Sequence, residues 1–455
     1  MVVDASDAAS PEVATDVCER ALALVGDRGE AVASAVVGTS SLTRFANSRI
    51  HQNVSEEVRT VTLTVAVDGR MARTSTTRTD GDGLAALAEG ALAAAALRPV
   101  DPDFGGFAPP AAVAPVEHWD DGTAAATPDD RAAAVAAFVA AAGGLEAAGY
   151  CSTSATTRVL VSTTGQRAAA RSSLARIDGI ARVVAGGEHP ADGFAQVTAV
   201  ALADVDGAAC GARAAAKATG GRDPVELAPG SYEVVLEPRA VASALLFPAL
   251  YGFNGKAHAE GTSFVHLGEP QWDAAIDVWD DATDPRAQGV PFDVEGTPAR
   301  RVDMVRAGVS VGLAHDRRSA RLAGVEPTGH SIGMEAFGGY PGHLFLGGGA
   351  AAPADLVGAV ERGLLVTDLW YNRILDPKTQ VVTGLTRNGL FLIEGGQVVG
   401  PVQNLRYTQA VVAAFGPDRV RGLGDDAQLV GGEDGIMHVP SVHLGAWSFT
   451  GNARG

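Results

Sequence analysis

An alternation of apolar with small or polar residues from Arg59 to Val67 restricts the fold more than any other feature of this sequence. The apolar positions are Val61, Leu63, Val65 and Val67, and those between them are Thr60, Thr62, Thr64 and Ala66. Because side chains alternate between the faces of a β-strand, this pattern is typical of an antiparallel sheet with one buried face. Asp68-Gly69 follows and favours a tight hairpin turn. The segment therefore predicts an antiparallel hairpin.

Segments with helical spacing of apolar residues flank this β-rich region. Pro11 to Val25 and Asp82 to Leu97 predict helices on either side of short strands between Glu30 and Arg78. A connector rich in Pro, Gly and Asp follows, from Arg98 to Pro128. Beyond it we expect a helix at 128–142, strands at 149–161, 165–179 and 194–203, and a helix at 205–217. The order helix, strands, helix thus occurs at 11–97 and again at 128–217, which suggests a duplicated α+β unit.

The glycine-rich stretch from Gly220 to Pro224 predicts a domain boundary, with residues 1–222 on one side and 223–455 on the other. The second part opens with a strand, Tyr232 to Leu236, and a helix, Pro238 to Gly252. Another helix is expected from Ala352 to Gly363, where Pro353 suits a first turn. Short strands are expected at 275–279, 301–305, 309–313, 343–346, 389–394 and 398–402. The predicted fold class is α+β, an N-terminal region of antiparallel strands with flanking helices followed by a strand-rich C-terminal domain.

The net charge and the cysteine content limit the classes of function and the cellular compartment that the sequence allows. The 455 residues carry 35 Lys and Arg against 53 Asp and Glu, a net charge of −18, which argues against nucleic-acid binding. The cysteines, Cys18, Cys151 and Cys210, form no metal-binding cluster and fit buried thiols in a reducing cytosol. Met1 to Ser10 lacks the pattern of a secretory leader, and Pro248 interrupts the apolar segment from Val241 to Phe253. We expect a cytoplasmic protein that does not bind membranes.

Several motifs occur in a fixed order along the chain. They are LTRFANSRIHQN (Leu42 to Asn53), GTSFVHLGE (Gly261 to Glu269), PFDVEGTPARR (Pro291 to Arg301), SARLAGVEPTGHSIG (Ser319 to Gly333) and LLVTDLWYNRILDPKTQVVTGLTRNGLFLIEGG (Leu364 to Gly396). Together they resemble the TldD/PmbA family, once called modulators of DNA gyrase and now understood as subunits of TldD/TldE metalloproteases. The resemblance runs over roughly residues 30–445.

The resemblance implies a subunit without a metal. TldD-type chains hold zinc with an HExxxH helix and a late cysteine, and the Glu is the general base; TldE/PmbA-type chains keep the fold without these residues. In two neighbouring registers, the family's His, Glu and His fall on Phe247, Pro248 and Gly252, or on Leu246, Phe247 and Tyr251. Apart from the weak phenol of Tyr251, none of these side chains can bind zinc, and no cysteine follows Cys210. The chain is therefore identified as TldE-like, with no cofactor of its own and with zinc expected in a TldD-like partner.

Other residues suggest alternative sites. His258 and Glu260, in an expected loop from Asn254 to Gly261, could form a relocated metal or acid-base site, although a solvated pair is the simpler interpretation. His438 and His443 are five residues apart, which on one strand would place them on opposite faces. An acidic cluster of Asp280, Asp281, Asp284, Asp293 and Glu295 could bind a divalent cation or could serve turns and caps.

Two polar motifs are candidates for substrate binding. Thr328-Gly329-His330 and Arg387-Asn388 lie between expected strands, where they could line a peptide groove or supply turn residues. Trp370 to Arg373 combines aromatic rings with a guanidinium, as interfaces do, although core packing of Trp370 is equally compatible. The glycine-rich stretch from Phe345 to Pro353 lacks the ending of a phosphate-binding loop and is expected to be a loop.

The function expected from the resemblance is that of a non-catalytic subunit of a cytosolic zinc metalloprotease. The chain would be inactive alone, would pair with a TldD-like subunit, and would help to hold unfolded or small peptides by strand addition. Two alternatives remain open, an independent hydrolase with a relocated site and a peptide-binding scaffold without peptidase activity. A homodimer also remains open, because an interface that lacks its partner can pair with itself.

Overall fold

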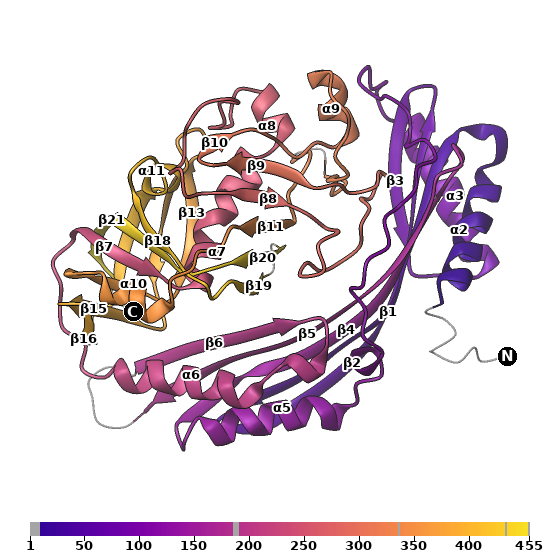
Figure 1. The fold of residues 1–455 in the computed structure, drawn as a ribbon. Coiled ribbons are helices and arrows are strands. Elements are labelled where there is room, and N and C mark those ends of the chain that lie inside the picture. Colours follow the sequence, from indigo (N-terminus) through magenta and orange to yellow (C-terminus); the bar gives the residue numbers. More distant parts are fainter. Residues whose placement is uncertain (1–9, 185–190, 335–336, 433–434, 454–455) are drawn as a thin grey trace.

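The computed structural model describes residues 10–184, 191–334, 337–432 and 435–453 (Figure 1). The N-terminal segment, Met1 to Ser10, lies outside these residues except for Ser10. The fold is α+β, as expected: a long antiparallel sheet is formed by the first part of the chain, and two further sheets by the second part.

The N-terminal sheet has six strands in the order β3-β2-β1-β4-β5-β6, all antiparallel. The strands are β1 Glu30–Ala46, β2 Arg49–Val67, β3 Arg70–Thr76, β4 Glu146–Ser162, β5 Arg167–Val183 and β6 Ala191–Ala199. The predicted alternation is confirmed, since Val61, Leu63 and Val65 are fully buried. Asp68 and Gly69 have φ angles of 49° and 72°, as a tight hairpin requires. The short strands expected between Glu30 and Arg78 were wrong in length, because β1 and β2 are long and continuous.

Four helices cover one face of this sheet. They are α2 Pro11–Val25, α3 Gly81–Ala96, α5 Pro128–Ala141 and α6 Gly207–Gly220. Ala33 of β1 packs with α2 and α3, and Phe45 of the same strand packs with α5. Their even spacing in sequence puts both side chains on the same face. Each half of the sheet therefore shows the order helix, three strands, helix, and its origin by duplication stays a prediction.

The connector links the two parts of the molecule. Its Asp120 caps a short helix, α4 Asp121–Ala124, that was not expected. His118 is fully buried between the parts, with its ring nitrogens 2.9 Å from the carbonyl oxygen of Asp284 and 3.2 Å from that of Gly289. A second link runs from the N-terminal sheet to the start of α7 Pro238–Phe247, where Arg239 hydrogen-bonds Gln196.

The C-terminal part contains two sheets. One has the order β10-β9-β8-β11-β20-β19, and the other has the order β13-β14-β17-β21-β7-β12-β15-β16, with β18 paired to β21. The strands are β7 Gly230–Leu236, β8 Val278–Asp280, β9 Val302–Arg306, β10 Val309–Ser310, β11 His343–Leu346, β12 Arg362–Val366, β13 Leu369–Asp376, β14 Val381–Thr386, β15 Leu390–Glu394, β16 Gln397–Pro401, β17 Leu405–Ala410, β18 Val420–Leu423, β19 Gln428–Gly432, β20 Gly435–Val439 and β21 Val442–Asn452. Small helices lie between them: α8 Gly255–Ala259, α9 Arg317–Ala323, α10 Pro353–Gly358 and α11 Val411–Ala414.

Several expectations for this part were wrong. The helix expected from Ala352 to Gly363 ends at Gly358, and its last residues begin strand β12, which pairs with both β7 and β15. The strand expected from Ala275 begins only at Val278, because Ile276 closes a turn onto Asp273. Strand β10 keeps two of the five residues expected at 309–313. Strands β13, β14 and β17 to β21 were not predicted. Strand β21 pairs with β7, far away in sequence, whereas β13 pairs with the next strand, β14, in a register that bulges interrupt.

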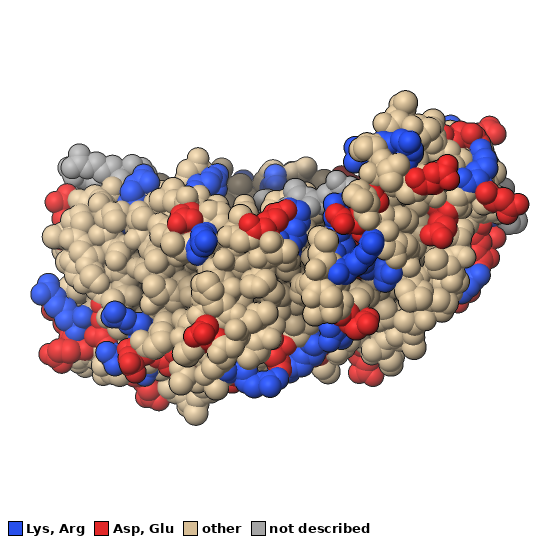
Figure 2. All heavy atoms as spheres, turned by 90° about the horizontal axis from the view of Figure 1, so that it is seen from above, with Lys and Arg blue, Asp and Glu red and all other residues tan. Residues whose placement is uncertain are grey.

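The state of the cysteines agrees with the expectation from the sequence. The three cysteines are buried and free. Within residues 10–184, 191–334, 337–432 and 435–453, no helix is long and apolar enough to cross a membrane. On the face that Figure 2 shows, acidic and basic side chains are interspersed over a largely neutral surface.

Candidate functional site

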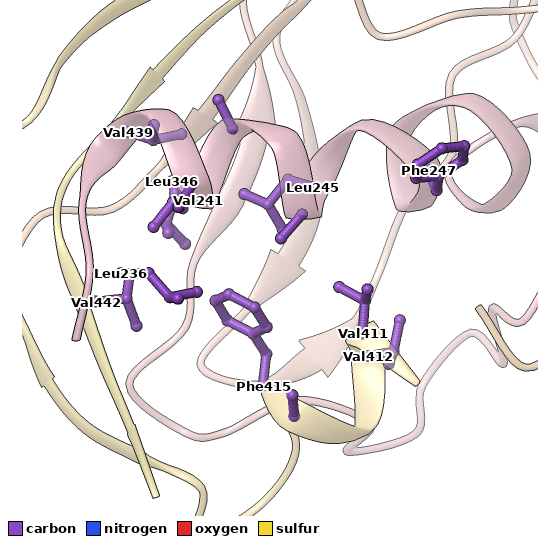
Figure 3. Packing of buried hydrophobic residues seen from close by; sticks show 14 of the residues in the cluster. Leu236, Val241, Leu245, Phe247, Leu346, Val411, Val412, Phe415, Val439 and Val442 are labelled. Atoms are coloured by element: carbon purple, nitrogen blue, oxygen red, sulfur yellow. The ribbon is translucent and has the colours of Figure 1, made fainter. Parts of the chain in front are cut away.

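The helix that carries the metal-motif positions is part of the largest hydrophobic core. Strand β7 leads into α7, which begins at Pro238 and continues through a π-helical turn, η3 Pro248–Gly252. Pro248 therefore does not interrupt the helical segment, and the expected helix end at Gly252 is correct. Val241 and Leu245 are fully buried and point toward Phe415 (Figure 3). Residues of both C-terminal sheets, such as Leu236 and Val439, pack in the same core.

The five metal-motif positions are filled by packed apolar groups. Phe247, Pro248 and Gly252 are buried, and Leu246 and Tyr251 are half-buried. The rings of Phe247 and Tyr251 stack with centroids 6.4 Å apart, and Tyr251 also contacts Phe337. A side chain on Gly252 would collide with the ring of Phe264 at 2.0 Å. The space that ligands would need is therefore occupied by rings.

The chemistry of these positions does not fit zinc. Zinc in proteins takes cysteine sulfur, histidine nitrogen or carboxylate oxygen, and these five side chains offer only the phenol of Tyr251. In the part of the chain that the structure describes, no three His, Cys, Asp or Glu side chains gather as metal ligands would. These five side chains pack into the core and include no imidazole and no carboxylate.

His258 and Glu260 lie beside this core on a short helix. The loop expected from Asn254 to Gly261 was wrong, because Asn254 caps α8 by accepting hydrogen bonds from the amides of Lys256 and Ala257. Glu260 forms an ion pair with Lys256 over 2.6 Å, and His258 is exposed. These contacts favour the solvated interpretation of the pair.

His438 and His443 lie on separate strands, so the argument from their spacing along one strand does not apply to them. His438 lies on β20 against the ring of Phe345, with centroids 5.3 Å apart. His443 lies on β21, in the other sheet, and its Nε2 is 2.8 Å from a carboxylate oxygen of Glu233.

Thr328, Gly329 and His330 belong to a buried polar network. The imidazole Nε2 of His330 donates to Asp280 over 2.8 Å, and its Nδ1 is 2.9 Å from the Thr328 carbonyl oxygen. Thr328 bonds to both backbone groups of His315. Burial raises the pKa of Asp280, but the charge and hydrogen bond of His330 outweigh it and bring this pKa below its ordinary value. Correspondingly, burial lowers the pKa of His330, and Asp280 outweighs that effect and raises it.

The remaining acidic residues are engaged in turns. Asp281 accepts from the amide and hydroxyl of Thr283, and Asp284 pairs with Arg286. Asp293 accepts from the amides of Glu295, Thr297 and Ser331, a pattern of turn stabilisation. Burial raises the pKa of Asp293 to about 6. It raises that of Glu295 to about 8, with the charge of Asp293 acting in the same direction.

Arg387 and Asn388 contact a different set of residues. Asn388 is buried and donates to Asp368 over 3.2 Å, whereas the exposed Arg387 lies over the ring of Trp370 at 4.1 Å. Asp368 also pairs with Arg239 over 3.0 Å. Sequence reasoning missed this buried ion pair, and the lone arginine in the first turn of an apolar helix was its only signal. The assignment of either motif to substrate binding stays a prediction.

Trp370 and Tyr371 lie at the surface. They belong to β13, an end strand of its sheet, and are 41% and 58% exposed. Arg373 lies over the ring of Tyr371 at 4.6 Å. Core packing of Trp370, one of the two interpretations offered by the sequence, is therefore excluded.

A long antiparallel sheet joined to two sheets around a buried helix defines a class of metallopeptidase-like α+β proteins, and sequence comparison agrees. Residues 31–95 match the PmbA/TldA metallopeptidase domain 1, and residues 229–451 match the PmbA/TldA metallopeptidase C-terminal domain. The chain belongs to the TldD/PmbA family, as its ordered motifs indicated.

Curated relatives match part of the chain. A metalloprotease from Synechocystis is 23% identical over 207 residues, which are 43% of this chain and 42% of the relative. A metalloprotease TldD homolog from Buchnera aphidicola is 23% identical over 224 residues, 46% and 45% of the two chains. The match thus spans less than half the length of these relatives.

Solved structures share the fold along nearly the whole chain. TldE from Thermococcus kodakarensis has a TM-score of 0.85 at 17% identity, covering 96% of this chain and 99% of that one. A protein described as a modulator of DNA gyrase from Bacteroides thetaiotaomicron gives 0.84 at 19% identity, with coverage of 97% and 99%. Its counterpart from Thermotoga maritima gives 0.81 at 18% identity, with coverage of 96% and 100%.

Proposed function

We propose that this chain is a TldE-like, non-catalytic subunit of a cytoplasmic zinc metalloprotease, and that a TldD-like partner supplies the zinc and the general base. The observation that carries the proposal is the packing of Leu246, Phe247, Pro248, Tyr251 and Gly252, where catalytic relatives would need ligands. Because Phe247, Pro248 and Gly252 are buried among aromatic rings, no small rotation of side chains creates a metal site. The likeness to TldE supports the assignment at the level of the fold.

The share of this subunit in proteolysis would be to hold unfolded or small peptides by strand addition, in which backbone hydrogen bonds give affinity without strong sequence preference. Strand β16 ends the larger C-terminal sheet and exposes Val398 and Val399, which supports this mode of binding. A cytoplasmic location is supported by the three free, buried thiols.

The proposal is tested with the full chain and the TldD-like chain of the same organism. Purified alone, this chain should hold no stoichiometric zinc by elemental analysis and should leave a fluorogenic unfolded peptide intact. After mixing, zinc should be present in the complex and the peptide should be cleaved. Stoichiometric zinc together with hydrolysis by this chain alone would refute the proposal.

A double variant, His258→Ala with Glu260→Ala, separates the proposal from a relocated active site. Since His258 is exposed and Glu260 is paired with Lys256, the variant should fold normally and leave the activity of the mixed complex unchanged. Loss of turnover in this variant, with an unchanged melting temperature, would favour an independent hydrolase.

A further inference from the structure

A cationic aromatic surface lies at one end of the larger C-terminal sheet. Strand β13 is the end strand there, so its outer edge has no neighbouring strand among the described residues. The surface, here called the β13 patch, consists of Trp370, Tyr371, Arg373, Leu375, Arg387 and Arg406, all of which are exposed.

The strand register places Trp370, Arg373 and Arg406 on the outer face of the sheet. Trp370 pairs with Leu385 of β14, and Leu385 pairs with Arg406 of β17. Side chains of directly paired residues point to the same face, so Trp370 and Arg406 share it. On the opposite face, Ile374 pairs with Val382 in the core. The β13 patch is thus on the solvent side of a sheet whose other side packs against the core.

The exposure of large apolar groups here is unusual. Trp370, Tyr371 and Leu375 are 41%, 58% and 59% exposed, on a strand of eight residues. Aromatic residues and arginine are enriched at the energetic centres of protein interfaces. A cluster of such residues at the edge of a sheet therefore indicates a surface that contacts another protein.

The charges of the patch favour an acidic occupant. Arg373 and Arg387 stack on Tyr371 and Trp370 at 4.6 and 4.1 Å, and neither forms an ion pair with a residue that the structure describes. Asp376, at the end of the strand, is engaged by the Lys378 amide and the Thr379 hydroxyl. Three guanidiniums thus face outward on a protein with a net charge of −18. If two copies of this chain paired through their β13 patches, the guanidiniums of one patch would face those of the other. The repulsion between these like charges disfavours a symmetric dimer through the patch.

The edge geometry favours a docked surface over an added strand. The register of β13 against β14 shifts between Trp370 and Arg373, and Tyr371 has a φ angle of 54°. Such a bulge interrupts the row of backbone groups that an added strand would need. The occupant is therefore expected to meet the side chains of the patch.

We propose that the β13 patch docks a carboxylate-rich surface of the TldD-like partner, an inference that rests on the proposed function. Carboxylates between stacked guanidiniums form charge-assisted hydrogen bonds, and the rings beside them exclude water. The complex should then weaken as salt rises, because part of its affinity is electrostatic.

The test compares two double variants that carry the same change of charge. Arg373→Glu with Arg387→Glu alters the patch, and Arg20→Glu with Arg59→Glu alters exposed arginines of the N-terminal half. Binding to the TldD-like chain is measured by calorimetry at low and high salt. The patch variant should bind at least about tenfold more weakly than wild type, as loss of an interface anchor does. The control should bind within about twofold of wild type, since Arg20 and Arg59 lie outside the β13 patch.

The outcomes separate this inference from the proposed function. If wild type binds and the patch variant binds equally well at the same salt dependence, the docking assignment is overturned while the proposed function stands. If wild type does not bind the TldD-like chain, both are overturned. If the patch variant instead abolishes self-association of this chain, measured by sedimentation, the occupant is a second copy and the assignment to the partner is wrong. Melting temperatures of both variants near that of wild type exclude misfolding as the cause.

Discussion

The imidazole of His330 donates a hydrogen bond to Asp280 over 2.8 Å, and both side chains are buried. The two residues are fifty positions apart in sequence, and the bond fixes the Thr328 to Ser331 turn against β8. Removing one partner of such a pair leaves the other charge buried without compensation, which makes the pair sensitive to mutation and to pH.

His330→Gln should therefore lower the free energy of unfolding by about 3–5 kcal/mol near neutral pH, as breaking a buried pair does. The measurement is denaturant unfolding of both proteins, with the exposed His258→Gln as a control that should stay within about 0.5 kcal/mol. Because the pKa of His330 is raised, its contribution is complete below the ordinary histidine pKa and is lost as the pH rises through the raised value. The pKa of Asp280 is lowered, so its contribution is present above the ordinary carboxyl pKa and is lost as the pH falls through the lowered value. The prediction would be contradicted if the His330→Gln variant were as stable as wild type at a pH between the lowered pKa of Asp280 and the raised pKa of His330.

Glu295→Gln should change the pH dependence of stability between pH 4.5 and about 8. Burial, with the charge of Asp293, raises the pKa of Glu295 from 4.5 to about 8. The folded protein thus keeps a proton that the unfolded chain releases, so this contribution is complete below 4.5 and is lost as the pH rises through about 8. The melting temperature of wild type should fall more steeply than that of the variant as the pH rises from 4.5 to about 8. The exposed Glu57→Gln should follow wild type, and parallel curves for all three proteins would disprove the assignment.

The three cysteines should be unreactive in the folded protein. Burial raises the pKa of Cys18, Cys151 and Cys210 to about 12, so little thiolate forms at neutral pH. A chromogenic disulfide reagent should detect three thiols only after unfolding in guanidinium. A Thr379→Cys variant, with its new thiol on an exposed turn, should react at once with one equivalent. Rapid reaction of wild type in its folded state would contradict this expectation.

Gly329→Ala should destabilise the protein, whereas Gly90→Ala should stabilise it. Gly329 has a φ angle of 77°, and an added Cβ would lie 2.4 Å from the Pro298 carbonyl oxygen, so we expect a loss of more than about 1 kcal/mol. Gly90 lies inside α3 with free space around it, and alanine there should add about 0.5–1 kcal/mol. Thermal unfolding measures both, and an unaffected Gly329→Ala would show that the turn tolerates another backbone conformation.

The parts of the fold that the sequence predicted are those with local periodicity. Helix α2 matches its predicted range, Pro11 to Val25, because its apolar spacing, Ser10 cap and Pro11 all act within one segment. The strands of the C-terminal sheets were harder to predict. Strand β13 lacks alternation, since a bulge at Tyr371 shifts its register, and its identity depends on pairing with β14. Strand β14 follows β13 directly along the chain, so β13 was missed because its alternation is interrupted and not because its partner is distant.

The candidate site divides in the same way. The absence of metal ligands at Leu246 to Gly252 could be read from the motif, because it depends only on residue types. The burial of Thr328 and His330 could not be predicted from their own motif, because it depends on Asp280, which lies in the distant strand β8. Similarly, the exposure of Trp370 follows from the position of β13 at the end of its sheet.

The centre of the N-terminal sheet joins β1 to β4 along their length, from Val32 opposite Ser162 to Phe45 opposite Gly149. A cut in the connector would therefore place β1 and β4 on separate fragments, and each fragment alone would leave fourteen residues of strand edge without their partner. We expect each fragment alone to be prone to aggregation, because an unpaired strand edge can pair with other chains. When the two fragments are co-expressed as separate polypeptides, β1 and β4 should pair and restore the continuous sheet. The connector is therefore a suitable position at which to split the protein.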